Sequence, residues 1–186
     1  PGATGTIGMN DANLAPHDGY TLIANATPYS HGVLGLADWT PYDWDFLAAY
    51  YVPGIIAVNK DSEYKTFDDL YKALQDKPGE VTGGTAGVGS TGYVNMEVLK
   101  SADPVFGNYK HIAYTGGAAA VTATLAGEVD FTPQLSNEMI DLLRSGDLVA
   151  LAALTADDLT FEGLDYTIPS IKNFLPEVEK VLPLGD

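Results

Sequence analysis

The chain has 186 residues, 46% of them hydrophobic and 18% charged, which is enough apolar sequence to bury one sizeable core or two small ones. Its 25 acidic and 9 basic residues give a formal net charge of −16, which excludes nucleic acid and anionic lipid as partners because both carry the same sign. It has no cysteine and no apolar run near the roughly 20 residues of a membrane-spanning helix, so we expect neither thiol chemistry, nor Cys-ligated zinc, nor membrane insertion.

Six short apolar runs along the chain predict β-strands. Most of them are apolar at successive positions rather than at alternate ones, which is typical of strands covered on both faces. In chain order the runs are residues 20–25, 46–52, 55–59, 109–113, 128–132 and 148–155.

Four stretches between the later strands have helical spacing, with signals at their starts or ends. Because helices of this length alternate with the strands, the sequence predicts an α/β fold with a mostly parallel sheet. In chain order the helices follow Thr66, cover residues 92–100, cover residues 118–125 up to Gly127, and follow Ser136 up to Gly146.

The densest glycine signal lies at residues 83–92, GGTAGVGSTG, between an expected strand at 80–82 and the helix that follows. Backbone amides at a helix start are unpaired, and the helix macrodipole adds partial positive charge there, so an anion fits such a loop. Ser90 and Thr91 add hydroxyl donors. The alternative is a tight strand-to-helix turn in which one of these two residues merely caps the helix.

The same loop contains the pattern G-x-G-x-x-G at residues 87–92, which occurs in dinucleotide sites. Such a site needs an acidic residue about 20 residues further on, at the end of the next strand, but that strand leads into Tyr114 instead. A nucleophile elbow is excluded because Val88 rather than glycine stands two residues before Ser90. No lysine follows the glycines, as a P-loop requires, so we expect no cofactor.

The other polar residues form no catalytic or metal-binding pattern. His17, His31 and His111 are far apart, with no H-x-x-H pair, so no metal site is predicted. Asp130 is expected to end its strand, where ligand sites of open sheets gather, although a lone aspartate there is equally typical of a turn cap. No stretch supplies a nucleophile, a base and an orienting group together, so residue spacing favours a binding domain over an enzyme.

The order of motifs along the chain resembles one family. PGATGTIG at the start and APHDGYTL at residues 15–22 are similar to the P-G-A-G-G-x-I-G and A-x-P-D-G-Y-T-L run of the tripartite tricarboxylate transporter solute receptors, the Bug or TctC family. The similarity continues in order through KTFDDL (65–70), KPG (77–79), the loop at 83–92, HIAYTGG (111–117), LAGEVD (125–130), SGDL (145–148) and IPS (168–170).

The resemblance implies a type II periplasmic-binding fold, in which two α/β lobes hold the ligand between them. It also implies a periplasmic solute-binding protein, not an enzyme, that delivers a small organic carboxylate to the integral-membrane permease subunits of a tripartite tricarboxylate transporter. The apolar strands at 55–59 and 148–155 bracket the motif-rich middle of the chain. We therefore expect residues 56–152 to form one complete lobe, the second, and residues 1–55 with 153–186 to form a partial first lobe.

The resemblance also indicates where the ligand binds. Receptors of this family typically hold the carboxylate through backbone amides and hydroxyls of strand-to-helix loops rather than through a dedicated arginine, and the only arginine here, Arg144, lies on an expected helix. In the first lobe the expected ligand-binding residues are Asn25, Thr27, Ser30 and His31. In the second lobe they are Ala86, Gly87, Gly89, Ser90 and Thr91, with Tyr114, Gly116, Asp130 and Gln134.

The sequence departs from the family pattern in three ways. The family's first strand and its closing segment are absent, so we expect an incomplete first lobe and a processed chain or a piece of a longer one. Gln134-Leu135 stands where the family often has an Asp-Asn pair, and lysine and arginine are scarce. Two other classes stay open: an effector-sensing domain of a transcription regulator, which needs an adjoining DNA-binding domain, and an α/β enzyme, which needs a triad that the spacing does not supply.

Overall fold

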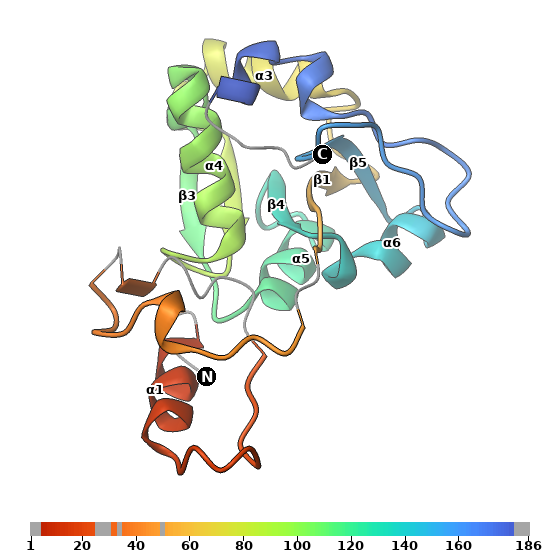
Figure 1. The fold of residues 1–186 in the computed structure, drawn as a ribbon. Helices are drawn as coiled ribbons and strands as arrows, with labels where there is room; N and C mark the ends of the chain where they lie inside the picture. The colour runs from red at the N-terminus through yellow and green to blue at the C-terminus, as the bar shows by residue number, and fades with distance from the viewer. Residues whose placement is uncertain (1–4, 25–30, 33–34, 49–50, 181–186) are drawn as a thin grey trace.

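The computed structural model describes residues 5–24, 31–32, 35–48 and 51–180. Its strands are β1 (Gly54–Asn59), β2 (Thr82–Thr85), β3 (Lys110–Ala113), β4 (Phe131–Leu135) and β5 (Leu148–Ala153). They form one five-stranded sheet in the order β3-β2-β4-β1-β5 (Figure 1). β2 is parallel to β3 and to β4, whereas β1 is antiparallel to both of its neighbours, β4 and β5.

Helices cover both faces of this sheet. The α-helices are α3 (Phe67–Asp76), α4 (Thr91–Ala102), α5 (Gly117–Leu125) and the shorter α6 (Ile140–Ser145). Short 3₁₀ helices of three to five residues are η3 (Pro104–Asn108), η4 (Ser136–Glu138), η5 (Ile171–Asn173) and η6 (Pro176–Lys180). The α/β class is therefore confirmed, but the sheet is mixed rather than mostly parallel, because alternation of helices and strands in a sequence does not fix the direction of each strand.

The interior strand β1, between β4 and β5, explains why the chain has two apolar cores. Ile56 and Val58 pack on the side of α3 and α4, and Ile55 and Ala57 pack on the side of α5 and α6. Every second side chain of a strand points to the same face, so a strand buried on both faces must be continuously apolar. This confirms the strand predicted at 55–59.

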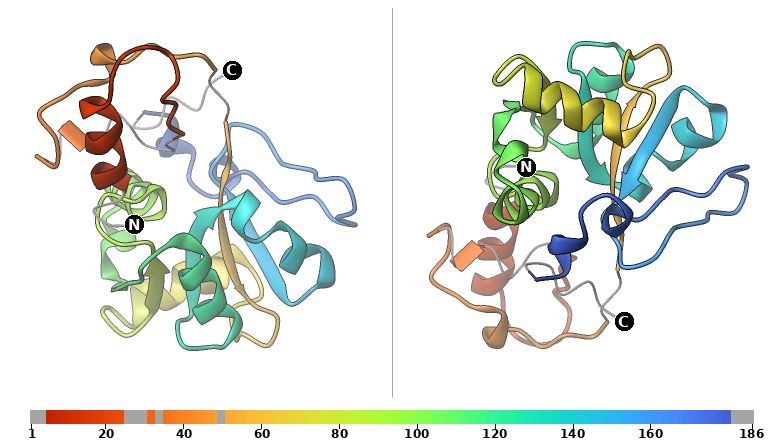
Figure 2. Two further views of the ribbon diagram at one scale, coloured as in Figure 1. Left: turned by 90° about the horizontal axis from the view of Figure 1, so that it is seen from below. Right: turned by 90° about the horizontal axis from the view of Figure 1, so that it is seen from above.

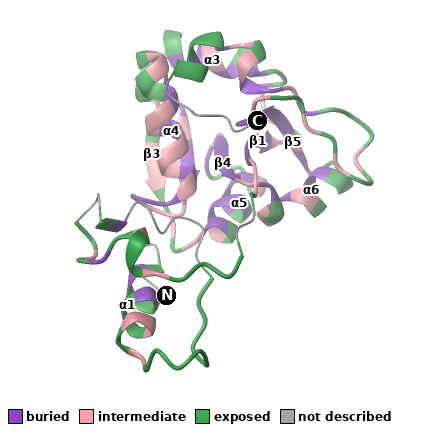
Figure 3. Cartoon of the chain, in the orientation of Figure 1, coloured by how far each residue is buried: buried purple, intermediate pink, exposed green. Residues whose placement is uncertain are grey.

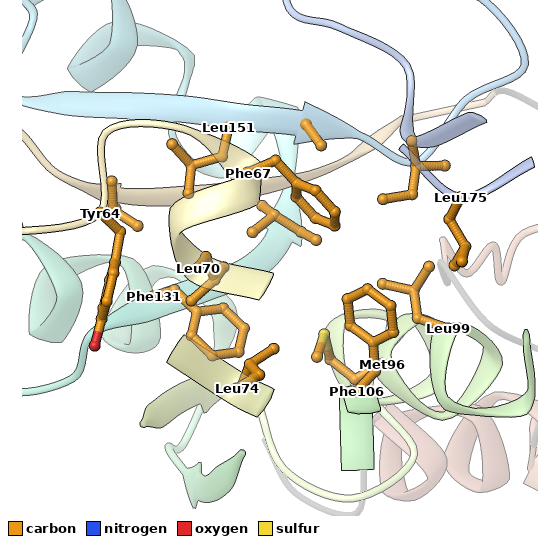
Figure 4. Packing of buried hydrophobic residues seen from close by; sticks show 14 of the residues in the cluster. Tyr64, Phe67, Leu70, Leu74, Met96, Leu99, Phe106, Phe131, Leu151 and Leu175 are labelled. Carbon is orange, nitrogen blue, oxygen red and sulfur yellow. The ribbon is translucent and has the colours of Figure 1, made fainter. Parts of the chain in front are cut away.

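The larger core lies between α3, α4 and the sheet (Figure 4). Phe67 and Phe106 stack with ring centroids 6.0 Å apart, and Phe131 from β4 closes the cluster. Ile171, Leu175 and Val178, from the segment after β5, pack into the same core. We call residues 54–180 the sheet body; the assignment of residues 153–186 to a different lobe from 56–152 stays a prediction.

Two predicted strands are displaced along the sequence. The strand expected at 128–132 is observed as β4, Phe131–Leu135, and the strand expected at 80–82 is observed as β2, Thr82–Thr85. β2 therefore contains Gly83 and Gly84, two glycines that the sequence analysis assigned to the loop. A Cβ on Gly83 would lie 2.7 Å from the rings of Phe131 and Tyr109, so glycine is required there for close packing rather than for a turn.

The N-terminal segment, residues 5–48, is built differently. Its described residues contain α1 (Thr6–Leu14) and the turn η2 (Pro41–Asp43), and it lies beside the sheet body, beyond the lower end of β3 (Figures 1 and 2). The strands predicted at 20–25 and 46–52 are wrong over the residues that the structure describes, which are not in strands. Tyr20 is 92% exposed and Leu47 78% exposed, so the described residues of the two runs lack the covering layers and the ladder partners that a strand needs (Figure 3).

Candidate functional site

The carboxyl ends of β2, β3 and β4 lie at one edge of the sheet, because these three strands run in the same direction. The loop at 86–90 follows β2, residues 114–116 follow β3, and Gln134 and η4 lie at the end of β4. Open α/β sheets bind their ligands at such an edge. We call this group of loops, with the first turns of α4 and α5, the strand-end site.

The loop at 86–90 makes a tight connection between β2 and α4. Gly87 and Gly89 have φ angles of +98° and +84°, which L side chains rarely adopt, so the glycines are needed by the turn itself. Ser90 is the N-cap of α4: its Oγ accepts a hydrogen bond from Tyr93 N at 3.3 Å. The loop is therefore a capped strand-to-helix turn, as the second interpretation predicts. A capped turn still exposes backbone amides, so the anion-binding interpretation stays open.

The amides of this loop divide into used and free groups. Gly87 N donates to Thr85 Oγ1 at 3.2 Å, and Ser90 N donates to the Gly87 carbonyl at 3.1 Å. Among the described residues no hydrogen bond accounts for the remaining amides, which are those of Val88, Gly89, Thr91 and Gly92. Free amides at the start of a 12-residue helix favour a negatively charged group.

Gln134 at the end of β4 takes up the amide of Ala86. Because Ala86 N can only donate, the side-chain oxygen of Gln134 must face it, and it accepts this bond at 2.8 Å. The Gln134 side-chain nitrogen then donates to Glu138 Oε2 at 3.2 Å. α4 begins directly against the end of β4. A Cβ on Gly92 would lie 2.7 Å from the Pro133 carbonyl oxygen and 3.1 Å from the side-chain amide carbon of Gln134.

The start of α5 forms the other side of the site. Tyr114 N donates to the Thr85 carbonyl at 2.8 Å, which extends the pairing of β3 with β2 up to the turn. Gly116 is the N-cap of α5 and offers no side chain, and within the described chain the amides of Gly117, Ala118 and Ala119 have no acceptor. Like the start of α4, this helix start presents unpaired donors at the strand-end edge.

Glu138, which no sequence motif indicates, lies against the start of α5. A Cβ on Gly117 would overlap the Glu138 carboxyl, so only glycine permits this approach. Glu138 Oε2 accepts from Leu135 N at 3.3 Å, and the half-buried carboxyl has its pKa raised by burial, against a lowering by that bond. The contact depends on the tertiary structure, so no local pattern in the sequence indicates it.

Thr85 links His111 to the loop at 86–90 by hydrogen bonds. Thr85 is fully buried, and its Oγ1 lies 2.6 Å from His111 Nε2 while accepting the amide of Gly87. Burial lowers the pKa of His111, and the charge of Glu97 acts in the opposite direction. His111 therefore positions the loop through Thr85.

The structure brings together eight of the predicted ligand-binding residues, at the ends of the three parallel strands. They are Ala86, Gly87, Gly89, Ser90, Thr91, Tyr114, Gly116 and Gln134.

Asp130 lies apart from them. It precedes β4, and its Oδ2 accepts from Thr82 N at 2.7 Å and from Thr82 Oγ1 at 2.6 Å, at the amino ends of β4 and β2. The expectation that Asp130 ends its strand is wrong because β4 begins one residue later, and the alternative of a capping role fits its contacts.

Of the residues predicted from the first lobe, the structure describes only His31. Asn25, Thr27 and Ser30 lie outside the described residues. His31 is fully buried in the N-terminal segment, with Nδ1 2.9 Å from Thr6 Oγ1 and its ring centroid 5.3 Å from that of Trp39. Burial lowers its pKa as well.

Within the described residues, no three histidine, cysteine, aspartate or glutamate side chains lie together where they could hold a metal ion. In the same residues, no helix has the length and apolar character to cross a membrane.

Comparison with known proteins identifies one family of transport receptors. The family model "Tripartite tricarboxylate transporter family receptor", TctC, matches residues 1–175. Protein BugT of Bordetella pertussis is 29% identical over 166 residues, which are 86% of this chain and 50% of that protein. The chain spans about half the length of the curated relatives it matches.

Solved structures share the fold. A TctC solute-binding protein from Polaromonas, solved without ligand, is 25% identical with a TM-score of 0.68, and the match covers 94% of this chain and 59% of that one. MatC from Rhodopseudomonas palustris, solved with bound malate, has a TM-score of 0.80 at 20% identity over 95% of this chain and 60% of its own.

Proposed function

This chain belongs to the tripartite tricarboxylate transporter receptor family, and on that premise we propose that its strand-end site binds a small organic carboxylate. The observation that carries the proposal is the convergence of two helix starts, those of α4 and α5, whose free amides lie at the ends of adjacent parallel strands. Amides in this arrangement hold a carboxylate oxygen by charge-assisted hydrogen bonds. The malate in the related MatC structure supports the same ligand class.

The charge distribution also supports recognition by amides. The chain has a net charge of −16, and none of its 9 basic residues falls within 86–92, 114–119 or 134–138. Its only arginine, Arg144, donates to Asp141 on α6 and to the Glu162 carbonyl in the segment after β5. The negative charge of a ligand at this edge is therefore balanced by backbone dipoles.

The biological role that follows is that of an extracytoplasmic receptor. We place the protein in the periplasm, where it delivers its carboxylate to the integral-membrane permease subunits of a tripartite tricarboxylate transporter. The ligand lies between the second lobe, residues 56–152, and a first lobe to which residues 1–55 and 153–186 contribute.

The test is a calorimetric titration of the protein, as the cell makes it, with small mono-, di- and tricarboxylates and with the matching neutral amides. At least one carboxylate binds and raises the melting temperature, since a ligand specific for the folded state stabilises it. The matching amide does not bind. Equal binding of a carboxylate and its amide contradicts recognition of an anion.

Gly116→Val is the variant that blocks the site without strain. A Cβ on Gly116 meets nothing within 4 Å and the residue is extended, whereas Gly89→Val would impose a φ of +84° on a branched residue. Gly116→Val abolishes binding because its side chain covers the start of α5. Thr122→Val, on the exposed face of the same helix, is the matched control and leaves binding unchanged.

Salt gives an independent readout. Affinity held by amides changes little between low and high ionic strength, and the on-rate rises with salt because the repulsion by the net charge is screened. A steep loss of affinity with added salt shows that a cationic side chain holds the ligand and contradicts the proposal.

A further inference from the structure

One carboxylate of the protein itself occupies the strand-end site. Glu138 lies between Gln134, whose amide links it to the loop at 86–90, and Gly117 at the start of α5. Its Oε2 has two donors, Leu135 N at 3.3 Å and the Gln134 side-chain nitrogen at 3.2 Å. Glu138 is thus held at a fixed place beside both helix starts.

The second oxygen of Glu138, Oε1, lies against Gly117 at the start of α5. Among the described residues Oε1 accepts no hydrogen bond, no lysine or arginine pairs with the carboxyl, and the side chain is half-buried rather than enclosed. An ionised carboxylate oxygen can only accept hydrogen bonds. A donor group of a ligand at this position satisfies it, whereas a second negative charge there is repelled.

We infer that Glu138 determines ligand specificity: the receptor takes a carboxylate whose second polar group is a hydrogen-bond donor, a hydroxyl, amide or ammonium, and rejects a second carboxylate. The first carboxylate binds at the start of α4, where the free amides of Val88, Gly89, Thr91 and Gly92 lie. The donor group of the ligand lies toward the start of α5 and Glu138 Oε1. This inference rests on the proposed function and narrows its ligand class.

The experiment compares pairs of ligands that have the same chain length and differ at one end. The probes are the linear dicarboxylates of three to six carbons, each paired with the ω-hydroxy and ω-amino monocarboxylates of the same length. Affinities are measured by calorimetry for the wild type, for Glu138→Gln and for Asp141→Asn. Glu138→Gln keeps an acceptor for Leu135 N, and Asp141→Asn removes the same charge at an exposed position on α6 that contacts Arg144.

In the wild type, the best ω-hydroxy or ω-amino acid binds at least tenfold more tightly than its dicarboxylate partner. Glu138→Gln raises the affinity for that dicarboxylate at least tenfold, and Asp141→Asn changes it less than twofold. If Glu138→Gln does not fold, as judged by circular dichroism, the wild-type preference alone decides.

Two results overturn the inference in distinguishable ways. A wild type that prefers the dicarboxylates, or a Glu138→Gln variant with unchanged preference, refutes the role of Glu138 while carboxylate binding stands. If none of these probes binds to any variant, and none of the mono-, di- and tricarboxylates titrated against the wild type binds either, the proposed function is refuted, and the inference with it.

Discussion

The apolar runs of the sheet body are buried, whereas those of the N-terminal segment are exposed. In the sheet body Ile55 and Phe131 are fully buried, whereas in the N-terminal segment Tyr20 is 92% exposed and Leu47 78% exposed. The two regions do not differ in having apolar runs; they differ in what surrounds those runs. β1 has a strand on each side and helices on each face, and residues 20–24 have neither. An apolar run becomes a strand only where other elements take its backbone groups and cover its side chains.

The largest expected difference between the regions is in amide hydrogen exchange. Amides of β1 exchange only on sub-global or global opening, while residues 21–24 lack strand pairing and exchange from the native state. Protection factors measured by mass spectrometry or NMR are expected to differ by at least about 10³-fold. Comparable protection in both segments would show that residues 21–24 are paired in solution and would remove the contrast.

Truncation of a core ring is the next largest effect. Phe106 is buried between Phe67 and Tyr71, so Phe106→Ala is expected to lower the free energy of unfolding by about 3–5 kcal/mol. The control is Trp39→Ala, because Trp39 contacts His31, Asn10 and Trp44, all in the N-terminal segment.

Two spectroscopic signals separate these effects. Both tryptophans of the chain, Trp39 and Trp44, lie in the N-terminal segment, so their fluorescence follows that segment, while far-UV circular dichroism follows mainly the sheet body. In urea titrations Phe106→Ala shifts the dichroism midpoint and Trp39→Ala leaves it nearly unchanged. Equal shifts from both variants would mean that the two regions unfold as one cooperative unit.

A pair of threonine caps tests the same contrast on a smaller scale. Thr66 caps α3, accepting from Asp69 N at 3.2 Å, and Thr40 takes the equivalent position before η2. Thr66→Ala is expected to destabilise the sheet body by about 1 kcal/mol, the usual cost of losing a cap. Thr40→Ala removes the hydrogen bond that Thr40 Oγ1 donates to Asp43 Oδ2 in an exposed three-residue turn, and it leaves the dichroism midpoint unchanged. A larger effect of Thr40→Ala than of Thr66→Ala on the dichroism midpoint would show that stability depends more on contacts of the N-terminal segment than on those of the sheet body.

The sequence predicts the sheet body well because its signals there are local. The cap at Thr66 and the stop at Gly146, observed with a φ of +75°, depend on neighbours along the chain, and the doubly buried β1 follows from its apolar run. Gly83 and Gly84 mislead, since glycine is equally typical of a turn and of close packing against rings such as Phe131.

The strand-end site is predicted in part for the same reason. Gly87, Gly89 and Ser90 carry their roles in the local geometry of a strand-to-helix turn, with positive φ and an N-cap. Glu138 reaches the site only through the fold, by approaching Gly117 across 21 residues of sequence, and the pattern around Glu138 does not indicate that contact. Asp130 is misplaced because a shift of the strand by a few residues moves it to the opposite end of β4.

The smallest expected effect concerns two histidines, one in each region: His31, which is buried, and His111, which is partly buried. Burial lowers the pKa of both His31 and His111. In the unfolded chain a histidine has a pKa of about 6.5, so below that pH the unfolded state binds a proton that the folded state resists. Stability is therefore fully present above pH about 6.5 and falls as the pH drops through the lowered folded-state values.

The position of each histidine decides which variant changes this slope. His111 bonds to Thr85 within the sheet body, so His111→Gln is expected to flatten the loss of the dichroism-monitored free energy of unfolding between pH 7 and 5. His31→Gln leaves that slope unchanged, because the contacts of His31 with Thr6 and Trp39 belong to the N-terminal segment. Instead it flattens the pH dependence of the tryptophan fluorescence. If His31→Gln altered the dichroism slope as much as His111→Gln, protonation of one region would be felt by the other, and the two regions would be energetically coupled.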